Sequence, residues 1–82
     1  MALYYFHIQT DVRESDTDGT ECATAHEARE QAIATCGQMM KDAAPDFWGS
    51  RPWIVTVTDF AGTILWQISM DGFAAPAALA LE

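Results

Sequence analysis

The chain has 82 residues, half of them apolar and a fifth charged, which suits one small domain with a core and argues against disorder. Twelve carboxylates against four basic side chains give a formal net charge of −8; this argues against nucleic-acid binding, which needs clustered Lys and Arg, and against anionic membranes. No apolar run approaches the roughly 20 residues of a membrane span, and the N-terminus lacks the basic segment of a signal peptide, so we expect a cytoplasmic location.

The first predicted element is a strand over residues 3–10, which are rich in aromatic and β-branched side chains. Alternation places Tyr4, Phe6 and Ile8 on one face of this strand and the intervening residues on the other. The polar segment 11–19 ends in Asp-Gly, which is a strong turn signal. Residues 20–23 are then expected to form a short second strand that pairs with the first.

A helix is predicted from Thr24 to Ala44. Thr24 and Glu27 match a capping box, the composition that follows favours helix, and Pro45 is expected to end it. Apolar residues recur at three- and four-residue spacing and predict a face that packs closely on a sheet; they are Ala25, Ala28, Ala32, Cys36, Met39, Met40 and Ala43.

Residues 46–52 are predicted to form a loop. After it we expect a hairpin, in which a turn at 60–62 joins strands 53–59 and 63–69, and then a tail. The side chains expected to face the helix are Trp53, Val55, Val57, Ile64, Trp66 and Ile68. Residues 1–72 are predicted to form a single domain and residues 73–82 an Ala-rich tail. The final Leu81-Glu82 is typical of a pair left by cloning.

These elements predict an α+β two-layer sandwich, with one helix on a mostly antiparallel sheet of three or four strands in the order β-(β)-α-β-β. One helix covers only one face of such a sheet. The opposite face is too apolar for ordinary surface and too polar for a full core, so we expect either the tail, through Phe73 and Leu79, or a second copy to cover it. That face would carry Leu3, Tyr5, His7, Ile54, Thr56, Thr58, Leu65 and Gln67.

The two cysteines are predicted to remain reduced. Cys22 lies two residues before the predicted helix and Cys36 twelve residues inside it. Their separation of at least ~11 Å exceeds the ~7 Å limit between the Cα atoms of a disulfide.

The order of motifs resembles domain-of-unknown-function family 6894, a group of short bacterial proteins, across residues 3–69. The motifs that carry this resemblance are Tyr4-Tyr5-Phe6-His7-Ile8, Asp18-Gly19-Thr20-Glu21, Glu27-Ala28-Arg29, Trp53–Asp59 and Gly62-Thr63-Ile64-Leu65. The family often has Leu-Pro-Asp before the helix where this chain has Cys22-Ala23-Thr24, and Thr24 can still cap. The family has no assigned activity, so the resemblance implies a shape and transfers no catalytic residue.

Candidate chemistry is sparse. His7 could act as a metal ligand or base, but neither of the two histidines has zinc-ligand spacing. The run Glu14-x-Asp16-x-Asp18-Gly19 imitates half of a calcium loop, yet Ala25 stands where the loop needs Glu. We therefore expect no catalytic residues, no metal and no cofactor. The aromatic residues that could line a ligand groove are more typical of side chains that close a small core; they are Phe47, Trp48, Trp53 and Trp66.

The leading interpretation is a non-catalytic protein-interaction module that associates through its sheet, as a homodimer or with a protein partner. The expected contact residues are Leu3, Tyr5, His7, Ile54, Thr56 and Leu65. One alternative is a small-molecule or metal-binding protein that uses His7 with nearby tyrosine and acidic residues. Another is an antitoxin-like regulator whose negative charge suits a basic partner.

Overall fold

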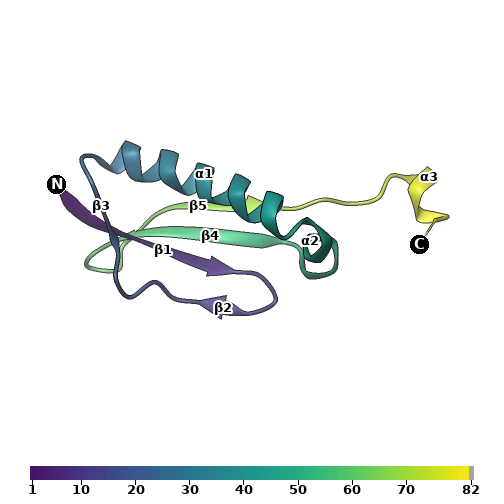
Figure 1. Ribbon diagram of the computed structural model, residues 1–82, viewed down its shortest axis with the longest axis horizontal. Coiled ribbons are helices and arrows are strands. Elements are labelled where there is room, and N and C mark those ends of the chain that lie inside the picture. Colours follow the sequence, from purple (N-terminus) through teal and green to yellow (C-terminus); the bar gives the residue numbers. More distant parts are fainter. Residues whose placement is uncertain (82) are drawn as a thin grey trace.

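Alternating apolar side chains build an antiparallel sheet of five strands in the computed structural model, which describes residues 1–81 (Figure 1). The strands are β1 (Ala2–Gln9), β2 (Arg13–Glu14), β3 (Thr20–Cys22), β4 (Trp53–Asp59) and β5 (Ile64–Met70). They are ordered β2-β1-β4-β5, and β3 also pairs with β1. The predicted α+β class and order are confirmed, with β2 as an additional strand inside the acidic segment.

One long helix, α1 (Ala25–Asp42), covers one face of the sheet, and two short ones follow it. The predicted cap is present, because Thr24 Oγ1 accepts the backbone N–H of Glu27 at 3.1 Å. The prediction of a loop over residues 46–52 is wrong, since α2 (Ala44–Ser50) fills most of it. Pro45 lies in the first turn of α2, where its missing N–H needs no partner. The chain then passes through a cis Arg51–Pro52 bond into β4.

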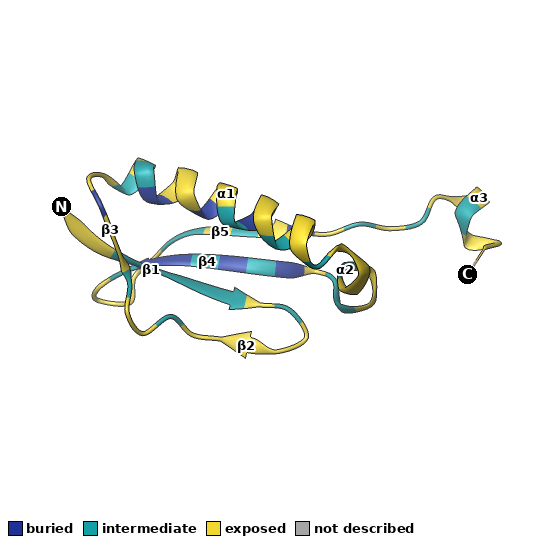
Figure 2. Cartoon of the chain, viewed as in Figure 1, coloured by how far each residue is buried: buried dark blue, intermediate teal, exposed yellow. Residues whose placement is uncertain are grey.

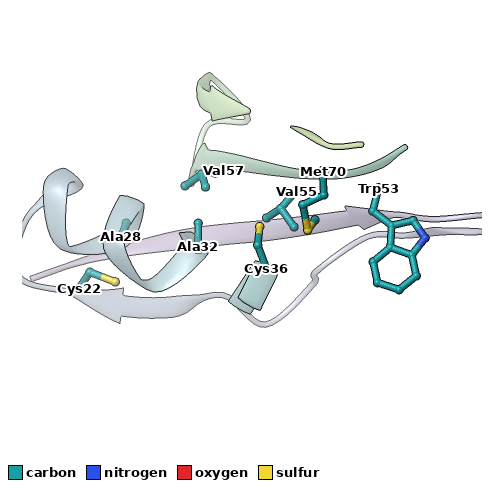
Figure 3. Close-up of a cluster of buried hydrophobic side chains, with 8 residues drawn as sticks. All are labelled: Cys22, Ala28, Ala32, Cys36, Trp53, Val55, Val57 and Met70. Carbon is teal, nitrogen blue, oxygen red and sulfur yellow. The ribbon is translucent and has the colours of Figure 1, made fainter. Parts of the chain in front are cut away.

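The core lies between α1 and the sheet (Figure 3). Its buried side chains are Cys22, Ala28, Ala32, Cys36, Trp53, Val55, Val57 and Met70. The small residues of α1 let the helix approach β4 and β5 closely, as the sequence predicted. The prediction fails for Met40, which is exposed because it lies on the flank of the helix, whereas Met39 packs against the core.

An irregularity in β5 changes which residue faces α1. Val57 pairs with Trp66, but Thr58 pairs with Ile64, so the register shifts around Leu65. Such a bulge breaks the strict alternation of side chains. Ile64 therefore shares the face of Thr58, opposite α1, and its predicted place beside Trp66 and Ile68 is wrong.

The tail does not cover the sheet face opposite α1. After Gly72 the chain runs away from the sheet and ends in the single turn of α3 (Pro76–Leu79) (Figures 1 and 2). Phe73 is 85% exposed and Leu79 is 59% exposed. The radius of gyration is 14.7 Å, against about 12 Å expected for a compact chain of this length. Of the pair interpreted as a cloning remnant, Glu82 lies outside the described residues.

Both cysteines are free and buried, which confirms the prediction of reduced thiols. Among residues 1–81, none of the helices has the length and apolar character to cross a bilayer.

Candidate functional site

His7 lies at the centre of the sheet face opposite α1, which we call the open face. Its Nδ1 accepts the backbone N–H of Asp16 at 3.2 Å, and its Nε2 lies 3.3 Å from Thr58 Oγ1. A ring that accepts at Nδ1 carries its proton on Nε2 and donates it to the Thr58 hydroxyl. Both nitrogens thus have partners inside the domain, which gives His7 a clear structural role.

The Asp16 carboxylate fixes the acidic segment against β1. One oxygen, Oδ2, accepts the Phe6 backbone N–H, and Oδ1 accepts the backbone N–H groups of Asp18 and Gly19, each at 3.1 Å. Partial burial raises the pKa of this carboxyl, but the bonds from Gly19, Phe6 and Asp18 and the nearby His7 outweigh it, so the pKa lies below its usual value. The Asp16 oxygens, at the centre of the run that resembles a calcium loop in the sequence, therefore bind backbone N–H groups.

The turn between β4 and β5 repeats this arrangement. Asp59 Oδ1 accepts the backbone N–H groups of Ala61 and Thr63, each at 2.9 Å. The glycine three residues after each aspartate has positive φ, 75° at Gly19 and 85° at Gly62. The sequence signal for both turns is Asp-x-x-Gly. Both turns were predicted, from Asp18-Gly19 and from residues 60–62, but without the role of the aspartate that begins each pattern.

The open face brings together four of the six predicted contact residues. Tyr5, His7, Ile54 and Thr56 are half-buried and adjacent on β1 and β4. The rings of Tyr5 and His7 stack, with centroids 6.4 Å apart. Of the other two, Leu3 lies near the start of β1, where it pairs with Glu21 of β3, and Leu65 lies at the bulge in β5.

The open face has one small hollow of about 230 Å³ beside the His7 ring. Its lining comes from β1, β2, the residue after β2, and the β4–β5 hairpin. The lining residues are His7, Arg13, Ser15, Thr56, Thr58, Gly62 and Ile64. The lining of this hollow includes no carboxylate to pair with the imidazole. Among residues 1–81, no group of three or more His, Cys, Asp or Glu side chains is arranged to hold a metal ion.

A larger cleft of about 870 Å³ lies at the far end of the sheet, between α1, α2 and the β1–β2 turn. Three exposed carboxylates line it, from Asp11, Asp42 and Asp46. Its further lining includes Thr35, Gln38, Met39, Ser50 and Trp53. No sequence pattern indicates this cleft, because its residues come from separate segments that only the tertiary packing brings together.

The aromatic side chains pack within the domain. Phe47 meets Trp53 edge to face at 5.0 Å, and this pair closes the core as predicted. Arg29 lies over the Trp66 ring at 5.4 Å. Trp48 is more exposed and lies under the Arg51 guanidinium at 3.8 Å.

The cysteine thiols have the properties of packing residues. Burial raises the pKa of Cys22, and the charge of Glu27 raises it further. Burial also raises the pKa of Cys36, more than a hydrogen bond from its own backbone lowers it. Since the thiolate is the reactive form, neither environment activates the sulfur as a nucleophile.

The order of strands, the two Asp-x-x-Gly turns and the capped helix fall within one family match. The model of a domain of unknown function (DUF6894) matches residues 3–71. The chain belongs to this family. The resemblance found in the sequence is thereby confirmed, and the DUF6894 match covers β1 from Leu3 onward, the other four strands, α1 and α2. Comparisons with curated proteins and with solved structures give no match. Membership in DUF6894 carries no assigned activity, so function is inferred from the surfaces.

Proposed function

We propose that this DUF6894 domain is a non-catalytic protein-interaction module that associates through its sheet, with a second copy or another protein as its partner. The observation that carries the proposal is the open face, which neither α1 nor the tail covers. Half-buried Tyr5 and Ile54 and exposed Ile64 lie on this face beside polar Thr56 and Gln67. A contiguous mixed surface of this kind is typical of protein interfaces.

The distribution of charge supports the same proposal. Residues 1–10 contain no charged side chain, and residues 52–70 contain only Asp59. These two stretches supply β1, β4 and β5. Nine of the twelve carboxylates lie between residues 11 and 46, in the segment from β1 to β3 and in α1 and α2. A partner that approaches the sheet therefore desolvates little charge, which matches the depletion of charge in the centres of interfaces.

The internal bonding of the polar residues supports a non-catalytic role. His7 and Asp16 each bond to groups of the domain itself, and the two thiols are buried. A general base needs a free nitrogen or oxygen within reach of a substrate proton. We therefore propose that these residues shape the open face and do not react with a ligand.

The test is site-specific photocrosslinking in the cell that makes the protein. A photoreactive residue replaces Ile54 on the open face, and a matched variant carries it at Ala34, which is exposed on α1. We expect a discrete adduct from position 54, with a second copy or with one other protein, and none from position 34. Equal adducts at both positions, or no adduct at position 54, would contradict the proposal.

A further inference from the structure

The outer edge of β5 is open for pairing. β5 ends the strand order, and among residues 1–81 no strand lies on its outer side. Its sequence Ile64-Leu-Trp-Gln-Ile-Ser-Met70 contains no charge, proline or glycine. Exposed strand edges are normally protected from pairing by charged residues, by proline or by bulges. The bulge here lies near the first residues of β5, and the pairing of residues 66–70 with β4 is regular.

The flank of α1 next to β5 is also apolar. Arg29 lies over the ring of Trp66, so this side of the helix borders β5. Positions 33, 37 and 40 continue the same side at helical spacing. Ile33 is 55% exposed, Met40 is exposed too, and a side chain at Gly37 would meet nothing within 4 Å. The helix thus presents a shallow apolar stripe above the free edge.

Exposed apolar side chains flank the edge at both ends. Phe60, in the turn before β5, is 80% exposed, and Phe73, in the arm after it, is nearly as exposed as a free side chain. Ile64 is 58% exposed on the open face. Phe60 and Phe73 lie seven and six residues from Gln67, on opposite sides of it. The edge is therefore nearly symmetric about its central residue.

We propose that a second copy of this chain pairs with β5, antiparallel, about a two-fold axis near Gln67. The inference rests on the proposed function and names the partner and the surface. Pairing about this axis brings Trp66 opposite the partner's Ile68, on the side of the sheet that faces α1. It also brings the arm at Phe73 alongside the partner's turn at the partner's Phe60. Each half of the interface covers the exposed residues of the other, as an isologous contact requires.

The second layer fits this pairing. α1 packs on both β4 and β5, so two copies joined at β5 place their helices about two strand spacings apart, or ~10 Å. Helices in contact lie about 8–10 Å apart. The stripes of Ile33, Gly37 and Met40 then face one another across the axis, and Gly37 leaves room for the opposing side chain.

The charge of the chain favours a second copy at this edge over other self-association. Two copies of net charge −8 repel one another, so contact is least costly where neither presents a carboxylate. β5 itself has none, Arg29 lies over its Trp66 ring, and Asp71, which follows its last residue, lies 4.0 Å from Arg51 Nε. The joined sheets would also present the two open faces as one continuous surface.

Light scattering after size exclusion, on the full chain and matched variants, tests the inference. We expect a mass of about 18 kDa, twice the 9.0 kDa of one chain. Gln67→Lys and Ile33→Glu each place like charges near the axis and should weaken dimerisation about 100-fold, giving monomers of unchanged circular dichroism. Ala34→Glu adds the same charge to the exposed side of α1 and should leave the dimer intact.

Ile54→Lys distinguishes the edge from the open face. A dimer that withstands Gln67→Lys and Ile33→Glu but dissociates with Ile54→Lys would overturn pairing at β5 while supporting association through the sheet. A wild-type chain that remains monomeric at millimolar concentration would also overturn the inference. In that case the photocrosslinking at position 54 separately decides the proposed function.

Discussion

Replacing Gly19 by alanine should destabilise the domain more than the same change at Gly62. Both glycines have positive φ, which costs an alanine about 1–2 kcal/mol. A Cβ at Gly19 would lie 3.1 Å from the Tyr5 ring and 3.3 Å from the Tyr4 carbonyl oxygen, whereas one at Gly62 meets nothing within 4 Å. Overpacking of this kind costs about 1–3 kcal/mol more. The entropy that alanine removes from the unfolded chain is the same at both sites and cancels in the comparison.

The expected losses are therefore about 1–2 kcal/mol for Gly62→Ala and about 2–5 kcal/mol for Gly19→Ala. An 82-residue domain has roughly 4–12 kcal/mol in total, so the second loss is large enough to unfold a measurable fraction of the protein. Urea unfolding followed by tryptophan fluorescence, at one protein concentration for all variants, gives both values. Equal losses at the two sites would refute the claim that the acidic segment packs tightly against the Tyr5 ring.

Three further outcomes follow from the contacts. Asp16→Asn should flatten the dependence of the free energy of unfolding on pH in acid. The pKa of Asp16 is lowered in the folded protein, so its carboxylate stabilises the fold above the ordinary pKa and loses this effect as pH falls through the lowered value. Unfolding measured at pH 2–7 on both proteins gives the difference. Arg51→Ala should make the C-terminal arm, the residues after Gly72, easier to cleave by protease. The reason is that Arg51 Nε donates a hydrogen bond to the Gly72 carbonyl at 2.6 Å. The control Lys41→Ala should not change the rate of cleavage. Cys22 and Cys36 should react with iodoacetamide only as fast as the domain opens, so alkylation in the native protein at the rate of a free thiol would contradict their burial.

The main elements of the fold could be predicted because local signals and tertiary packing agree. Thr24 and Glu27 locate the start of α1, and alternation in β1 and β4 identifies the buried face. The errors occur where local patterns have two readings. Pro45 signals both the end of one helix and the first turn of the next, and the prediction of a loop over residues 46–52 used only the first of these signals. Alternation also cannot locate a bulge, so Ile64 was placed on the wrong face.

The site was only partly accessible from sequence for a different reason. The position of His7 on the open face follows from alternation, but its hydrogen bonds depend on where Asp16 returns along β1. That return is set by the loop geometry at Gly19, which a pattern of residue types does not encode. The cleft lined by Asp11, Asp42 and Asp46 has the same origin, since its carboxylates are far apart in the chain.

The two aspartate turns connect the fold to the proposed association. Asp16 and Asp59 cap segments on either side of the β1–β4 pair, and each bonds through backbone N–H groups rather than through a core side chain. This arrangement holds the open face in shape while the Asp16 and Asp59 oxygens bond to backbone N–H groups. The central strands β1, β4 and β5 then carry only one charged side chain, Asp59, within a chain of net charge −8. The carboxylates of the acidic segment and the helices therefore make the central strands the least charged surface for the proposed association.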